Sequence, residues 1–160
     1  MADNIVMARA KEVYEDLCSM LDARGWKHKR HDDNMIVTFG VIGDDLPMDF
    51  VVGVDVERQL IRLISKLPFT VPEDKRMDLA IATGVASYRL VDGSFNYDIA
   101  AGSITFRLTA SFRESKIGPG LFTYLVNCAC SIVDMYNDKF LAISKGYTTI
   151  GDFIKEQKGN

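Results

Sequence analysis

The chain has few of the residues on which metal and thiol chemistry depend, with three cysteines and two histidines in 160 residues. An odd number of cysteines argues against a disulfide framework and fits a reducing compartment. Cys128 and Cys130 lie two positions apart on an expected helix, so their side chains diverge by about 200° and cannot share one ion. The phosphate-binding loop and the G-x-S-x-G, H-E-x-x-H and C-x-x-C motifs are absent from the sequence. We therefore expect no enzyme activity, no cofactor and no metal site.

An excess of positive charge and a long apolar run are also missing. The formal net charge is −3, which gives no general attraction to nucleic acid or to anionic lipid. Asn127, Ser131 and Asp134 interrupt the most apolar stretch before it reaches the ~18 residues of a membrane span. The first residues lack the basic region and the apolar run of a signal peptide. These absences predict a cytoplasmic protein with no nucleic-acid partner and no membrane partner.

The spacing of the apolar residues predicts helices at 4–24, 70–90 and 120–143. Either a T-x-x-E capping box at 70–73 or Pro72 begins the second of them. Strands are expected at 26–30, 35–39, 48–56, 59–67, 94–99 and 103–112. In the strand at 48–56, one face is predicted to pack on the core, because one parity holds Met48, Phe50, Val52, Val54 and Val56. This order, α-β-β-β-β-α-β-β-α, predicts an α+β fold with an antiparallel sheet packed by helices. The length and the hydrophobic fraction of 48% fit one domain at 1–147 and a short helical tail at 148–160.

The expected helix at 120–143 is too apolar to have only one covered face. One stripe contains Leu121, Leu125, Cys128, Ile132 and Met135, and a second contains Phe122, Val126, Ala129, Val133 and Phe140. The two stripes span roughly 200°, about twice what a one-sided surface helix needs. We predict that Phe122, Val126, Ala129 and Val133 form an interface with a second copy of the chain. The alternative is a monomer in which the tail around Phe153 covers the second stripe.

The expected helix at 70–90 has an unusually thin middle. Small side chains let another backbone approach closely, which suits a helix that packs on a sheet or on a partner helix. Ala80 and Gly84 therefore join the candidate interface of the predicted homodimer. An ordinary alanine-rich helix explains the same residues equally well.

Both histidines lie in the charged segment 27–33. In a strand, His28 and His31 point to opposite faces, and Asp32 and Asp33 partly cancel the basic run. A solvated edge strand explains this segment better than a ligand site. The aspartate pairs at 32–33 and 44–45 fall in turns, and neither matches a calcium-binding loop.

A set of short motifs resembles the YbjN domain family. The motifs are Leu67-Pro68, Val71-Pro72, Lys75-Arg76, Gly93-Ser94-Phe95, Asp98, Gly102 and the segment from Ile104 to Arg107. The resemblance covers roughly 13–146, and these motifs punctuate structure without forming a catalytic signature. Members of that family are labelled bacterial sensory transduction regulators, and their fold is similar to that of type III secretion chaperones. The resemblance implies a dimeric scaffold that binds a partner.

Three functions remain open at this point. The leading one is a chaperone-like or regulatory interaction module that binds a polypeptide segment of an unidentified protein through apolar helix and sheet surfaces. The second is a small-molecule sensor with its ligand between the sheet and the helices. An enzyme of unrecognised type comes last, because acid-base chemistry needs placed groups that the sequence does not show.

Overall fold

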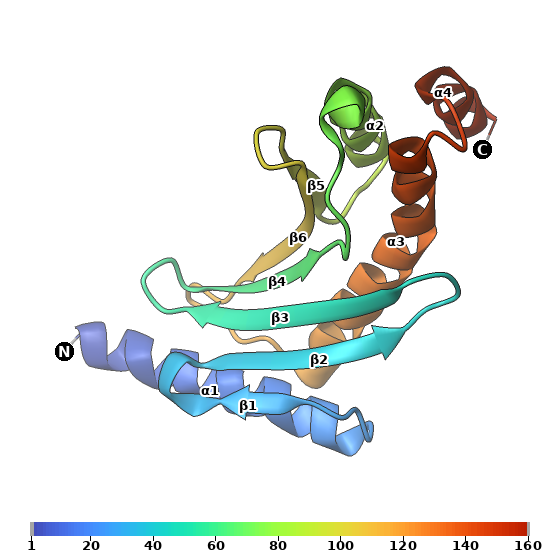
Figure 1. Ribbon diagram of the computed structural model, residues 1–160. Coiled ribbons are helices and arrows are strands. Elements are labelled where there is room, and N and C mark those ends of the chain that lie inside the picture. Colours follow the sequence, from blue (N-terminus) through green and yellow to red (C-terminus); the bar gives the residue numbers. More distant parts are fainter. Residues whose placement is uncertain (1, 160) are drawn as a thin grey trace.

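The computed structural model describes residues 2–159, which form one six-stranded antiparallel sheet and four α-helices (Figure 1). The strands are β1 (Lys29–His31), β2 (Ile36–Ile42), β3 (Pro47–Asp55), β4 (Leu60–Lys66), β5 (Ser94–Asp98) and β6 (Ser103–Ser111), in the sheet order β1-β2-β3-β4-β6-β5. The helices are α1 (Ala2–Ala23), α2 (Arg76–Tyr88), α3 (Pro119–Lys145) and α4 (Ile150–Lys158). The predicted α+β class and the order of its elements are confirmed.

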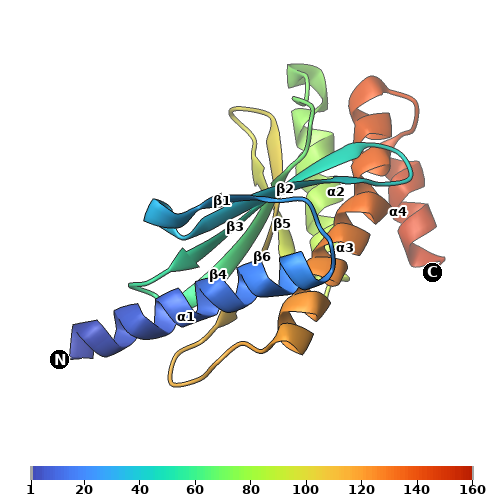
Figure 2. The same ribbon diagram turned by 90° about the horizontal axis from the view of Figure 1, so that it is seen from below.

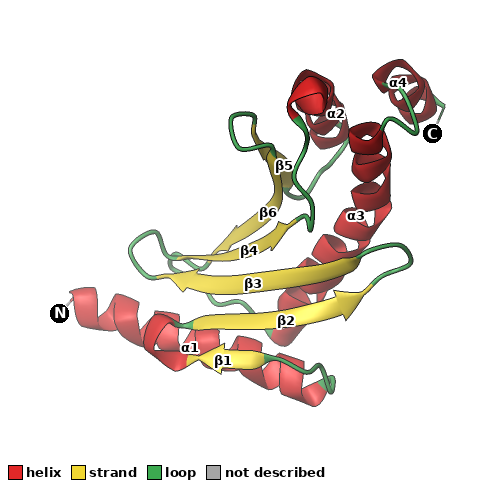
Figure 3. Ribbon diagram, viewed as in Figure 1, coloured by secondary structure: helices red, strands yellow, loops and turns green. Residues whose placement is uncertain are grey.

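The helices cover only one face of the sheet. Alternate residues of β3 are buried, from Met48 through Phe50 and Val52 to Val54. Figure 2 shows α1 and α3 on the side to which these residues point, and Figure 3 shows the strands in front with no helix of residues 2–159 over them. Antiparallel sheets commonly have one packed and one wet face, and the alternation in the sequence predicted this arrangement. We call the uncovered side the open sheet face.

Helix α3 contacts α1, α2 and three strands of the sheet. Its second stripe is therefore core, with Phe122 and Ala129 at 0%, Val133 at 1% and Val126 at 3% exposure. The prediction that these four residues form an interface is corrected, because neighbours from the same chain already cover the second stripe. The first stripe is the less covered one, and it leaves Leu121 and Met135 about half exposed.

Helix α4 begins with a capping interaction, in which the Asp152 N–H donates to Thr149 Oγ1 at 3.1 Å. One turn later Phe153 is 1% exposed and packs against Phe140, with ring centroids 6.1 Å apart. Phe140 belongs to the second stripe of α3. The alternative of a tail that covers this stripe is thus realised in part.

Two element boundaries differ from the sequence prediction. The expected strand at 26–30 is reduced to β1, because the Trp26 N–H donates to the Leu21 carbonyl and helps to close the end of α1. The capping box at 70–73 does not form, because the chain is still extended at Pro72, with φ −65° and ψ 154°, and the first turn begins only after it. A short 3-10 turn, Glu73–Lys75, follows Pro72 and leads into α2.

Several residues that carry the YbjN resemblance meet at one junction, where the turn between β5 and β6 packs on the segment between β4 and α2. Gly102 has φ +67°, and a Cβ at this position would lie 2.4 Å from the Val71 carbonyl oxygen. Only glycine fits such a backbone and such a contact. Asp98 accepts hydrogen bonds from the backbone of the same turn, and Arg76 donates to the Val71 and Ala100 carbonyls. These motifs therefore hold the fold together.

Replacing Val126 by aspartate is expected to unfold the protein. The carboxylate would be buried without a partner, at a cost of about 3–5 kcal/mol. Met135→Asp is the matched control, since it adds the same charge to a half-exposed position of the same helix. Chemical denaturation followed by circular dichroism would compare the two variants. A folded Val126→Asp protein with wild-type stability would contradict the core assignment.

Candidate functional site

The two histidines have separate partners. His28 lies back against α1, with Nδ1 2.7 Å from the Trp26 carbonyl oxygen and Nε2 3.4 Å from Asp22 Oδ1. Its side chain is only 7% exposed, so the predicted solvated position is wrong for His28. His31 is on the open sheet face, with Nε2 3.4 Å from Thr38 Oγ1. Within residues 2–159 no group of three or more His, Cys, Asp or Glu side chains could hold a metal ion.

The three cysteines are free thiols, and within residues 2–159 none of them belongs to a group that could hold a metal ion. Cys18 is buried, whereas Cys128 and Cys130 are both partly exposed. Burial raises the pKa of the Cys130 thiol to about 11, and the nearby Asp134 charge adds to this shift. A thiol with a raised pKa carries little thiolate at neutral pH and is a poor nucleophile.

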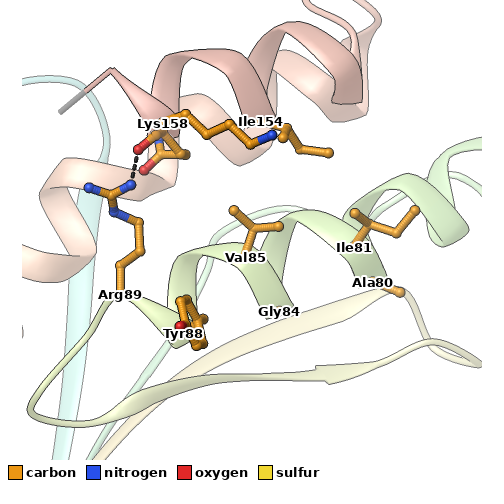
Figure 4. Close-up of a pocket in the computed structure, with 9 residues that line it drawn as sticks. Ala80, Ile81, Gly84, Val85, Tyr88, Arg89, Ile154 and Lys158 are labelled. Carbon is orange, nitrogen blue, oxygen red and sulfur yellow. Dashed lines mark hydrogen bonds between the residues drawn. The ribbon is translucent and has the colours of Figure 1, made fainter.

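Ala80 and Gly84 line a groove of about 770 Å³ between α2 and α4 (Figure 4). Ile81 and Val85 point from α2 toward this space, and Ile154 contributes from α4. Gly84 lies at its surface, where a Cβ atom would meet nothing within 4 Å. The structure thus places the two candidate interface residues of α2 together on an accessible surface.

The same side of α2 presents a row of exposed apolar residues. Met77 is 67%, Ile81 46% and Tyr88 91% exposed. Together with Gly84 they are spaced by four, three and four residues, which places them along one side of the helix. We call Met77, Ile81, Gly84 and Tyr88 the α2 stripe.

Polar contacts hold α4 against its neighbours at the edge of the groove. Tyr136 donates from its hydroxyl to Gln157 Oε1 at 3.2 Å, and both side chains are buried. The Arg89 guanidinium donates to the Gln157 carbonyl (Figure 4). Lys139 Nζ is 2.7 Å from Glu156 Oε1. Helix α4 is therefore an ordered wall of the groove.

The open sheet face has an apolar centre. Cross-strand pairing places Val51 beside Ile64, and Ile36 lies next to them across Gly53. Val51 is 40% exposed although it stands in the middle of the sheet. Two hollows of about 430 and 330 Å³ flank the Val51–Ile64 pair, and both are lined by these two side chains. We call Ile36, Val51, Gly53 and Ile64 the apolar strip.

Cationic side chains border the apolar strip. One row of register partners crosses all six strands and contains Lys29, Thr38, Val51, Ile64, Arg107 and Ser94. A cation therefore stands on each side of the Val51–Ile64 pair in this row. Lys66 lines the larger hollow and Arg62 the smaller one.

The carboxylates on this face are partly engaged by the chain itself. Asp55 Oδ2 is 3.0 Å from the Arg62 guanidinium, and hydrogen bonds from the Arg58 backbone and side chain hold the pKa of Asp55 below its usual range. Asp98 accepts hydrogen bonds from the backbone of its own turn. Asp49 lines the larger hollow. Lys29, Lys66 and Arg107 outnumber Asp49 around the strip, so the balance of charge there favours an anionic ligand.

The sequence did not indicate the open sheet face as a candidate site. Val51 and Gly53 share their strand parity with Asp49 and Asp55, and a single valine among such residues gives no apolar pattern. Ile64 lies on the same side of the next strand. The signal lay in the pairing of β3 with β4, which brings the two side chains together.

The fold defines an α+β class in which helices cover one face of an antiparallel sheet and leave the other uncovered. A scan against protein-family models and a search of curated proteins gave no match. Solved structures with the same fold include YbjN from E. coli, with 11% identity, a TM-score of 0.59, and coverage of 79% of this chain and 92% of that one. The ExsC-ExsE complex matches with 12% identity, a TM-score of 0.56, and coverage of 79% and 92%. The HopA1-SchA chaperone-effector complex matches with 15% identity, a TM-score of 0.55, and coverage of 82% and 97%.

Replacing Phe153 by alanine is expected to detach α4 from α2 and α3. The change removes a fully buried ring at a cost of about 3–5 kcal/mol, enough to detach a helix of two to three turns. Hydrogen exchange should show lost protection confined to α4. Lys155→Ala, at an exposed position of the same helix, should leave the protection intact. Unchanged exchange in Phe153→Ala would contradict the docking of α4.

Replacing Asp45 by asparagine is expected to stabilise the protein at neutral pH. The negative charge of Asp138, then partial burial and the charges of Asp134 and Asp44, raise the pKa of Asp45. A raised carboxyl pKa means that the folded state binds the proton more tightly, so the ionised group destabilises the fold near pH 7. The gain in melting temperature should disappear below about pH 4, where the carboxyl is protonated in both states. Asp33→Asn, in an exposed turn, serves as control, and an equal gain there would refute the explanation.

Proposed function

We propose that this chain is a non-enzymatic protein-interaction module, chaperone-like or regulatory, that binds a polypeptide segment of an unidentified partner. The observation that carries the proposal is the apolar strip, which is left uncovered in the middle of the sheet. Exposed apolar surface that is hollowed and bordered by polar groups marks sites of interaction. The match to the HopA1-SchA chaperone-effector complex and to the ExsC-ExsE complex supports this reading.

The proposal also includes the relationship to YbjN, the domain bounds and the cellular location of the protein. We place the chain as a divergent relative of YbjN, with 1–147 as its domain and 148–160 as a helical tail. No helix in residues 2–159 is long and apolar enough to cross a membrane. We propose a cytoplasmic location, with no cofactor and with neither nucleic acid nor membrane as partner.

Homodimerisation is the second part of the proposal, and the α2 stripe is its interface. The small residues Ala80 and Gly84 let a second helix approach closely, and Met77 and Tyr88 supply apolar contact at either end. Near the start of α2, Lys75 and Arg76 stand among Glu73, Asp74 and Asp78, so the charges there nearly cancel. In an antiparallel pair related by a two-fold axis, the α2 stripe would therefore pair through its apolar and small residues.

A small-molecule sensor is the alternative function. The groove between α2 and α4 has a volume of about 770 Å³, which lies in the range of ligand sites of roughly 300–1,000 Å³. Its apolar walls and the nearby Arg89 and Lys158 suit an apolar ligand with an anionic group. A second copy on the α2 stripe and a ligand in the groove would compete for the same surface.

Affinity capture of the full chain followed by intact-mass analysis would test the proposed function. We expect a polypeptide to copurify in a fixed ratio and to be lost when Val51 is replaced by lysine. Thermal shift with a metabolite panel would test the sensor function. A ligand that raises the melting temperature of the wild type but not of Gly84→Lys would replace the interaction module by the sensor.

Replacing Gly84 by lysine is expected to convert the dimer into a folded monomer. The position is open in the single chain, so the lysine fits there, and a helix gains about 0.5–1 kcal/mol when glycine is replaced. Light scattering should change from twice the chain mass to 17.9 kDa. Ser131→Lys, on the exposed side of α3, should remain dimeric. A wild-type mass of 17.9 kDa would reject the dimer, and a dimeric Gly84→Lys would place its interface elsewhere.

A further inference from the structure

We propose that the apolar strip of the open sheet face binds one amphipathic α-helix of a partner protein, with carboxylates flanking the apolar side of that helix. This inference rests on the proposed function and names its site and the chemistry of its partner. It concerns a different surface from the α2 stripe.

The bound segment is a helix because the strands under the strip have no free backbone groups for another strand. β3 is paired with β2 and β4, and β4 is paired with β3 and β6. An extended peptide gains its affinity by adding to a free sheet edge, which the strip does not offer. A helix satisfies its own backbone hydrogen bonds and needs only an apolar surface.

The two hollows set the spacing of the side chains that enter them. Asp49 lines the larger hollow and Gly53 the smaller one, and they stand four residues apart on β3. Four residues of strand span about 13 Å. A helix rising 1.5 Å per residue covers this length in about eight or nine residues, so large apolar residues near i and i+8 reach both hollows. The residue at i+4 then lies over Val51 and Ile64.

The charges around the strip select an acidic helix. Lys29 and Arg107 lie on opposite sides of the Val51–Ile64 pair in one row, and Lys66 borders the larger hollow. Carboxylates on both flanks of the helix would meet these cations. Asp55 is already paired with Arg62, and the cations outnumber Asp49, which lines the larger hollow. Such pairing fixes orientation and speeds association, and it weakens with salt.

A larger side chain at position 53 can fill the smaller hollow without disturbing the fold. Gly53 lies at the floor of the smaller hollow, and a Cβ there would be 3.5 Å from Ile36 Cγ1, an ordinary contact. Valine at this position favours the strand and occupies the hollow. Gly53→Val should therefore fold at least as stably as the wild type and lose the site.

The test uses the full chain and two synthetic peptides of about 18 residues that favour the helix. Both carry leucine at i, i+4 and i+8, with glutamate on the flanks in one peptide and lysine in the other. NMR titration of the 15N-labelled protein should show saturable shifts at Val51, Gly53 and Ile64 with the glutamate peptide. At low salt the lysine peptide should bind with an affinity at least about tenfold lower.

Three substitutions test where the glutamate peptide binds. Gly53→Val and Arg107→Glu should each weaken binding of the glutamate peptide about tenfold, and Gly84→Lys should leave it unchanged. Chemical-shift changes confined to α1, α2 or α4 would show that the peptide binds elsewhere. That result would overturn the strip as the site while leaving a polypeptide-binding module in place. No saturable binding by the wild type, or full binding by Gly53→Val, would also overturn it. The absence of any copurifying polypeptide as well would refute the proposed function itself.

Discussion

The packing of α1 and α3 against one face of the sheet is the interaction on which the rest of the structure depends. Phe50, Val52, Ile61 and Leu63 point to these helices from the two central strands and are almost completely buried. Helix α3 crosses several strands and also touches α1 and α2, so it joins the parts of the chain that are distant in sequence. The second stripe of α3 is therefore needed inside one copy of the chain.

The helices of residues 2–159 pack on one side of the sheet, and none of them covers the other side. The apolar strip and the α2 stripe are two parts of the apolar surface that the core leaves uncovered. They differ in chemistry, because cations outnumber carboxylates around the strip, whereas the stripe consists of apolar and small residues on one helix. A helix face of this kind can pair with the same face of a second copy, whereas a border with an excess of one charge suits a different molecule.

The sequence predicted the order of elements well, because alternating and helical spacings are local properties of the chain. The alternation of Met48, Phe50, Val52 and Val54 correctly predicted which side of β3 is packed. The width of the apolar arc on α3 was also correct. The predicted reason for this width, an interface with a second copy, was wrong. Periodicity cannot tell whether the same chain or another one covers Val126. The strip was missed for a related reason, because Val51 and Ile64 become neighbours only through strand register. Ala80 and Gly84 were selected by their small size, and the structure places both at the groove.

The pairing of β4 with β6 has a consequence for the way the chain folds. The ladders β2–β3, β3–β4 and β5–β6 join consecutive strands and can form early as hairpins. The β4–β6 ladder instead joins strands that are separated by α2 and β5, and its formation must close that long loop first. Contacts between distant parts of a chain slow folding. Until this ladder is complete, Ile61 and Leu108 lack the continuous surface on which α3 packs, so the two halves of the sheet and the third helix are expected to gain stability in one cooperative step.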